Sequence, residues 1–129
     1  MERHSSRPAT GEEAVARAWA ALRPGSRVRT QEGEQLEVRF TGLPNPGPGP
    51  DFRRALLRSE RGRLVRGDVE VHQTTTGWDA HGHGDDPRYR NVVLHVVAQD
   101  DRLVPVERLG GGRAPALVLR PSPDRKSVV

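Results

Sequence analysis

The sequence predicts an α/β domain of the α+β type, in which an amino-terminal helix packs on a mixed, largely antiparallel sheet. Three observations favour this class. An apolar stripe with helical spacing occupies positions 14 to 22. Several short segments alternate apolar and polar residues, which is typical of half-buried strands. The run at residues 91–98 is apolar on both faces, which is typical of a central strand.

The helix is expected over residues 10–22. Thr10 and Glu13 have the T-x-x-E spacing of a capping box. The apolar positions 14, 15, 18, 19 and 22 share one stripe, and Pro24 with Gly25 ends the helix. We therefore expect Trp19 to anchor the helix in the core.

Two hairpins are expected next, with strands at residues 27–30 and 35–41 and then at 52–59 and 63–72. Residues 42–50 between them contain four prolines and are predicted to be irregular. Residues 73–91 are predicted to form a loop or a short helical turn that Trp78 and Tyr89 pin to the body. After the central strand, a short edge strand is expected at 103–106 and a last strand at 116–119.

The strand at residues 63–72 has two different faces. Val65, Val69 and Val71 point to one side, whereas Asp68, Glu70 and His72 point to the other. A solvated face rarely has this composition, because like charges two residues apart on one strand repel each other. The polar face is therefore a candidate functional site.

The register of the second hairpin decides which residue joins this face. A two-residue turn at Arg61-Gly62 pairs Glu60 with Arg63, and counting back places Asp51 opposite His72. Opposed side chains have Cβ atoms about 4.5–5.5 Å apart. This register predicts that Asp51, Glu70 and His72 converge.

Carboxylates and imidazoles on one rigid face predict a divalent-cation site. Asp51 and Glu70 offer oxygen ligands for Mg²⁺ or Mn²⁺. His72 is expected to be a further ligand or a base that activates water, and His81 and His83 would close the site from a glycine-rich loop. The predicted catalytic residues are Asp51, Glu70 and His72, and the predicted metal ligands are these three with His81 and His83.

Simpler interpretations remain open for several of these residues. His81 and His83 fit a surface role equally well, and His95 fits a hydrogen-bonded core histidine. Asp85 and Asp86, before Pro87, fit a turn cap.

The composition sets further bounds. The chain has no cysteine, which excludes disulfides and thiolate metal sites. It has no apolar run of membrane-spanning length and no signal-peptide segment, so we expect a cytoplasmic protein without membrane contact. The net charge of +4 suits nucleic acid as a partner, with Arg53, Arg54 and Arg66 as expected phosphate contacts, although composition alone also explains evenly spread arginines. Oligomeric state stays open.

The two ends of the chain carry separate expectations. Residues 1–9 are polar and are expected to be disordered. The ending DRKSVV resembles a translated sequencing adapter, so residues 124–129 are expected to be non-native. Residues 10–123 would then form a single domain that is truncated at its carboxyl terminus.

Two family resemblances follow from these motifs. The strings GPDF, GDVEVH, HGH, DP-x-Y and NVVLHVV, over roughly residues 19–119, resemble the bacterial family called domain of unknown function 2851. That resemblance implies no particular activity. More distantly, Pro50-Asp51 and Glu70-Val71-His72 are similar to the motif of PD-(D/E)xK nucleases, with His72 in place of the lysine. This second resemblance implies Mg²⁺-assisted attack of water on a phosphodiester.

The leading hypothesis is therefore a divalent-metal-dependent, nuclease-like phosphodiester hydrolase. The alternative is a non-catalytic metal- or ligand-binding module with a structural His/Asp cluster, and a third is a plain hydrogen-bonded polar network. The sequence contains no phosphate-binding loop, G-x-S-x-G or H-E-x-x-H motif that would favour another enzyme class.

Overall fold

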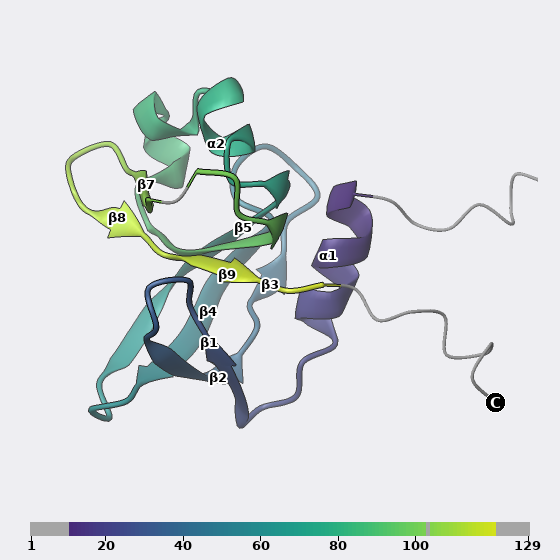
Figure 1. Cartoon of the computed structure of the whole chain (residues 1–129), viewed down its shortest axis with the longest axis vertical. Coiled ribbons are helices and arrows are strands. Elements are labelled where there is room, and N and C mark those ends of the chain that lie inside the picture. The colour runs from purple at the N-terminus through teal and green to yellow at the C-terminus, as the bar shows by residue number, and fades with distance from the viewer. Residues whose placement is uncertain (1–10, 103, 121–129) are drawn as a thin grey trace, which may run out of the picture.

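The fold is a mixed sheet with one long helix, described by the computed structural model for residues 11–102 and 104–120. The strand order is β1-β2-β4-β5-β6-β9, and the short β3 pairs with β4 (Figure 1). Pairs from β1 to β5 are antiparallel, whereas β5, β6 and β9 run parallel. This confirms the α+β class. The expectations for residues 1–9 and 124–129 lie outside the described residues.

The bounds of the elements are close to the expected ones. Helix α1 spans Gly11–Ala20, and short helices α2 (Gly77–Ala80), η2 (His83–Asp85) and η3 (Pro87–Tyr89) follow β5. The strands are β1 (Ser26–Arg29), β2 (Gln35–Phe40), β3 (Leu43–Pro44), β4 (Phe52–Ser59), β5 (Leu64–Thr74), β6 (Val92–Gln99), β7 (Val106–Glu107), β8 (Arg113–Ala114) and β9 (Ala116–Val118).

Helix α1 is held against the sheet by its apolar stripe. Val15 and Trp19 are fully buried, and the indole Nε1 of Trp19 donates a hydrogen bond to the carbonyl oxygen of Thr41 at 2.9 Å. The expected core role of Trp19 is thereby confirmed. Thr10, and with it the expected capping box, lies outside the described residues.

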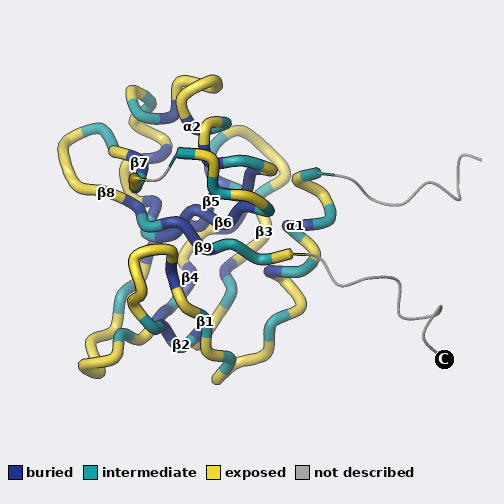
Figure 2. The backbone as a smooth tube through the Cα atoms, in the orientation of Figure 1, coloured by how far each residue is buried: buried dark blue, intermediate teal, exposed yellow. Residues whose placement is uncertain are grey.

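The main core lies between α1 and the central strands. It joins Val15 and Trp19 to apolar side chains from β2, β4, β5, β6 and β9. Figure 2 shows buried residues along the central strands and exposed residues at the hairpin tips. Trp78 and Tyr89 belong to a second cluster with Val92, which confirms that they pin the 73–91 segment to the body.

The turn between β4 and β5 differs from the expected one. The amide of Ser59 donates to the carbonyl of Arg63 at 2.8 Å, so three residues form the loop rather than two. Gly62 has a φ of 86°, which suits the left-handed position of a three-residue hairpin loop. The expected pairing of Glu60 with Arg63 is therefore wrong by one residue.

A β-bulge shifts the register again near the start of β4. Phe52 pairs with Val69 and Ala55 pairs with Gly67, so Arg53 and Arg54 together oppose one residue. Arg54 has a φ of 62°, a left-handed conformation that only the bulge explains. The predicted pairing of Asp51 with His72 is wrong, and Asp51 lies beside Glu70 instead.

Two smaller expectations also need correction. Leu43–Pro44 forms a short strand inside the proline-rich segment, which was predicted to be irregular, because an edge position tolerates the missing proline donor. The expected strand at 103–106 is β7, which begins at Val106 and pairs with β8 in a separate two-stranded sheet. Residue 103 lies outside the described residues. No helix in the described ranges is long and apolar enough to cross a membrane.

Candidate metal centre

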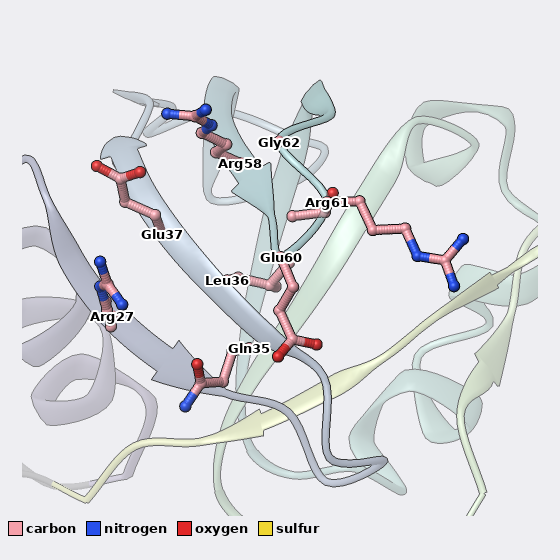
Figure 3. Close-up of a pocket in the computed structure, with 9 residues that line it drawn as sticks. Arg27, Gln35, Leu36, Glu37, Arg58, Glu60, Arg61 and Gly62 are labelled. Atoms are coloured by element: carbon pink, nitrogen blue, oxygen red, sulfur yellow. The ribbon is translucent and has the colours of Figure 1, made fainter.

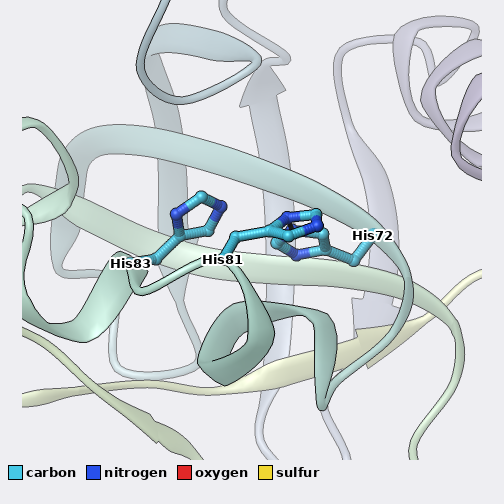
Figure 4. Close-up of side chains that lie close together, drawn as sticks. All are labelled: His72, His81 and His83. Atoms are coloured by element: carbon cyan, nitrogen blue, oxygen red, sulfur yellow. Dashed lines mark hydrogen bonds between the residues drawn. The ribbon is translucent and has the colours of Figure 1, made fainter.

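Three histidines meet on the polar face of β5. His72 comes from β5, His81 follows α2, and His83 begins η2 (Figure 4). One ring nitrogen from each lies within 4.8 Å of the other two. Gly82, between the two loop histidines, adopts a φ of 70° that few other residues tolerate. The short turn allows both His81 and His83 to approach the strand.

Glu70 places a carboxylate oxygen beside two of these histidines. Its Oε2 lies 3.3 Å from Nε2 of His72 and 3.2 Å from Nε2 of His83. Nε2 of His72 in turn lies 3.2 Å from Nδ1 of His81. Glu70, His72 and His83 are buried, whereas His81 is exposed. The cluster therefore reaches solvent at His81.

Asp51 contacts Glu70 on the side away from the imidazoles. Its amide donates to Oε1 of Glu70 at 3.3 Å, while its own Oδ2 accepts from the amide of Val71 at 2.9 Å. Glu12 of α1 is close enough that the charge of Asp51 adds to burial in raising the Glu12 pKa. Of the five predicted metal ligands, the three histidines form one group and Glu70 contacts two of them, whereas Asp51 contacts Glu70 alone among the five.

Burial keeps Glu70, His72 and His83 uncharged at neutral pH. Burial, reinforced by the charge of Asp51, raises the pKa of Glu70 to about 10. Burial also lowers the pKa of His72 to about 3 and that of His83 to about 4, and neighbouring histidines lower them further. The contacts of Glu70 with His72 and His83 are thus contacts between neutral groups, and the one with His83 is a hydrogen bond. A cation would reverse the penalty on the Glu70 carboxylate.

Two aromatic residues and a fourth histidine surround the cluster. The Tyr89 ring stacks on His83 with centroids 3.7 Å apart, and the Trp78 ring meets His83 edge-on at 5.4 Å. His95 on β6 is fully buried and lies 2.7 Å from Nδ1 of His72 through its own Nε2. His95 is a hydrogen-bonded core histidine, as expected. Its contact with His72 was not foreseen, because that contact depends on the β5–β6 pairing.

The three predicted phosphate-contact arginines are exposed and lie near the bulge. Arg66 donates from Nη1 to the carbonyl of Arg54 at 2.9 Å, and the amide of Arg54 donates to Oδ1 of Asp68 at 3.1 Å. Arg66 and Asp68 therefore have structural contacts at the bulge. The guanidinium groups of Arg53 and Arg54 are the better candidates for contact with a ligand.

Asp86 has a local structural role. Its side chain accepts a hydrogen bond from the amide of Arg88 at the start of η3 and forms an ion pair with the Arg88 guanidinium at 2.8 Å. This confirms the turn-cap interpretation for Asp86.

A cavity of about 380 Å³ lies elsewhere, between β1, β2 and the tip of the β4–β5 hairpin (Figure 3). Arg27 and Arg58 flank Glu37 at its wall, so the charges there largely compensate each other. None of the three clustered histidines lines this cavity. The candidate site is therefore the group formed by His72, His81 and His83 with Glu70.

Comparison with known proteins gives one match. A family model described as "Protein of unknown function (DUF2851)" matches residues 12–128. No curated protein and no solved structure matches the chain. Because the family model covers nearly the whole chain, the protein belongs to the DUF2851 family of proteins of unknown function.

Proposed function

We propose that Glu70, His72, His81 and His83 bind a divalent transition-metal ion and that the protein uses this ion to hydrolyse phosphodiesters, as a nuclease does. One observation carries the proposal: three imidazole nitrogens lie within 4.8 Å of one another, and a carboxylate oxygen of Glu70 contacts two of the three histidines. Strand β5 and the segment that follows it deliver these donors, and three of the four residues are buried. Such a convergence of donors is typical of metal centres.

The distances in the cluster fit such an ion. Bonds of about 2.0–2.1 Å at tetrahedral angles separate neighbouring ligand atoms by about 3.3–3.4 Å. The separations of Glu70 Oε2 from His72 Nε2 and His83 Nε2 are 3.3 and 3.2 Å, close to that value. His81 is exposed and lies at 3.2 Å from His72, so its ring can rotate to complete the set.

The donor set also bears on which ion is bound. Mg²⁺ or Mn²⁺ is expected from the sequence. Mg²⁺ prefers oxygen ligands, and Mn²⁺ also suits carboxylates, whereas imidazole ligands suit Zn²⁺ and its transition-metal neighbours. Three imidazoles beside one carboxylate therefore favour Zn²⁺ over Mg²⁺, with Mn²⁺ as the comparison ion. A bound divalent ion of this kind acts as a Lewis acid and makes a nearby water more acidic.

The placement of acids supports the choice of a phosphodiester substrate. Asp51 precedes β4, and Glu70-Val71-His72 lies on the adjacent β5, as in the nuclease motif. Glu12 on α1 adds a third acid beside Asp51. His72 is buried between Glu70 and His95, so its role is to hold the ion rather than to exchange protons with solvent. His81 is the one exposed ligand, so a water or substrate would approach the ion from the His81 side.

Arg53 and Arg54 supply positive charge on the substrate side. Both lie two to three residues after Asp51 in the chain and are exposed. Guanidinium groups bind phosphate oxygens in a bidentate manner. We assign these two arginines to the phosphates that flank the scissile bond. Arg66 would support Arg54, because Nη1 of Arg66 donates a hydrogen bond to the carbonyl oxygen of Arg54.

The test is cleavage of single- and double-stranded DNA and of RNA by the full chain after metal removal and reloading with Mn²⁺, Zn²⁺ or Mg²⁺. We expect cleavage that requires metal and falls by at least about 100-fold in Glu70→Ala. Glu60→Ala, an exposed acid at the hairpin tip, serves as the matched control and should cleave normally. A folded, metal-loaded protein without cleavage, or cleavage insensitive to chelators, would contradict the proposal.

A second candidate function is a non-catalytic module in which the same ion is structural. The burial of Glu70, His72 and His83 favours it, because the ion would tie the 77–89 segment to β5. This candidate predicts that chelation unfolds the domain, since the binding free energy is then folding free energy. Loss of activity with an intact circular dichroism spectrum would favour the hydrolase.

A further inference from the structure

His95 is a fully buried histidine that contacts His72 but is not one of the four proposed ligands. It lies on β6, where parallel pairing sets it beside Glu70 of β5. Its Nε2 is 2.7 Å from Nδ1 of His72, and the two rings are perpendicular with centroids 4.9 Å apart. The fully buried contact fixes the plane of the His72 ring.

The positions of the protons follow from this contact. A metal-binding imidazole nitrogen carries no proton, so the other nitrogen of the ring must carry it. If Nε2 of His72 binds the ion, Nδ1 of His72 donates to Nε2 of His95. His95 must then carry its own proton on Nδ1. That nitrogen is buried and, within the described part of the chain, forms no hydrogen bond.

The backbone leaves His95 and His72 little freedom to rearrange. The amide of His95 donates to the carbonyl of Pro115 at 3.0 Å, which links β6 to the segment before β9. A Cβ atom on Gly77 would lie 2.9 Å from Cδ2 of His72, so the backbone there packs directly on the ring. His72 is held on one side by Gly77 and on another by His95, and only its Nε2 points toward Glu70 and His81.

We infer that His95 is a positioning residue that holds His72 in the tautomer and orientation in which Nε2 is the ligand atom. This inference rests on the proposed function, because it concerns the same ion. His95 makes no contact with the ion itself. A hydrogen-bonded partner of this kind is usual behind metal-binding histidines, where carboxylates and carbonyls are the common acceptors.

Two substitutions separate positioning from simple packing. Glutamine at position 95 offers an amide group near the place of Nε2 and can accept the proton of His72, whereas leucine fills space without an acceptor. We expect His95→Leu to weaken Zn²⁺ and Mn²⁺ affinity by about 10–100-fold and His95→Gln to restore most of it. The ¹⁵N resonances of His72 in the Zn²⁺-loaded full chain should show a protonated, hydrogen-bonded Nδ1 in the wild type and in His95→Gln only.

The outcomes distinguish this inference from the proposed function. If the folded wild type takes up neither ion, both fail. If His72→Ala abolishes uptake but a folded His95→Leu binds as tightly as the wild type, the site stands and the role of His95 is refuted. Equal losses in His95→Leu and His95→Gln, with an unchanged His72 spectrum, would reduce His95 to a packing residue and also overturn the inference.

Discussion

Between Val69 and His72 both faces of β5 are buried, but they are chemically opposite. Val69 and Val71 pack with Val15 and Trp19 of α1, and their burial accounts for their presence. Glu70 and His72, on the other face, are 5% and 1% exposed, yet buried polar groups cost stability unless they are satisfied. One face of the strand stabilises the fold, and the other retains groups that folding alone would not select.

The contrast shows where stability and function separate in this small domain. The apolar face needs only shape and volume, so it tolerates conservative changes. The polar face needs particular atoms at particular distances, and in our proposal a bound cation offsets the cost of burying them. Four predictions test this division, starting with the largest effect.

A charge on the apolar face should prevent folding. Val71→Asp buries a carboxylate in the α1 core without a partner, and we expect a loss of more than about 4 kcal/mol in unfolding free energy. Urea denaturation followed by circular dichroism measures this. Glu70→Gln, one residue away on the other face, is the matched control and should change the metal-free protein by less than about 1 kcal/mol. Equal stability of wild type and Val71→Asp would refute the assigned orientation of β5.

Metal should stabilise the polar face selectively. At a free Mn²⁺ concentration 1,000 times its Kd, the unfolding free energy should rise by about 4 kcal/mol, because the ion binds the folded state. Thermal unfolding with and without chelator measures the gain. His83→Ala and Glu70→Gln should each lose most of it. If both variants keep the full gain, the ion binds elsewhere.

Acid should destabilise the metal-free protein. His72, His83 and His95 have pKa values lowered to about 3, 4 and 3, from 6.5, by burial. They stay neutral in the folded state while the unfolded chain takes up protons below pH 6.5, so stability falls as pH falls. Glu70, with its pKa raised from 4.5 to about 10, opposes this because its contribution is present below pH 4.5 and lost as pH rises to 10.

Between pH 6.5 and 4.5 the three histidines outweigh the one carboxyl. Near pH 5.5 unfolding should take up about two protons, so the unfolding free energy should fall by roughly 2 to 3 kcal/mol per pH unit. Urea midpoints at pH 6.5, 5.5 and 4.5 without metal test the sign and the size. A stability that is flat or that rises toward pH 4.5 would show that these imidazoles are not buried and neutral.

The smallest effect is expected at the bulge that aligns Asp51 with Glu70. Arg54 is the one described non-glycine residue with a positive φ, at 62°. Arg54→Gly should relieve this strain and raise the unfolding free energy by about 1 kcal/mol. Affinity for DNA, measured by fluorescence anisotropy, should fall because the guanidinium is lost. A destabilised variant would indicate that the Arg54 side chain supports the fold.

The sequence alone was sufficient to predict features that depend on the spacing of apolar residues within one helix or strand. The spacing of Val15 and Trp19 predicted α1 and its buried face, and the alternation in residues 63–72 predicted both faces of β5. The grouping of Glu70 with His72, His81 and His83 was also anticipated, because the glycine-rich loop follows the strand closely. The roles of these residues stay predictions.

Features that depend on pairing between distant segments were not foreseen. The register error at Asp51 arose because Gly62 allows a three-residue loop and because the bulge places an arginine where glycine would be the usual marker. The contact of His95 with His72 depends on the parallel pairing of β5 with β6, whose register shifts between Asp68 and Val69. No local pattern in NVVLHVV indicates which neighbour His95 meets.

The most direct test of a metal centre on the polar face of β5 is titration of Co²⁺ into the metal-free full chain, followed by visible absorption. We expect one ion per chain, with the strong d–d absorption of a four-coordinate nitrogen and oxygen site, in the wild type and in Glu60→Ala. The signal should disappear in His72→Ala and His83→Ala that remain folded. A folded wild type that binds no Co²⁺, or histidine variants that bind it as the wild type does, would contradict the account.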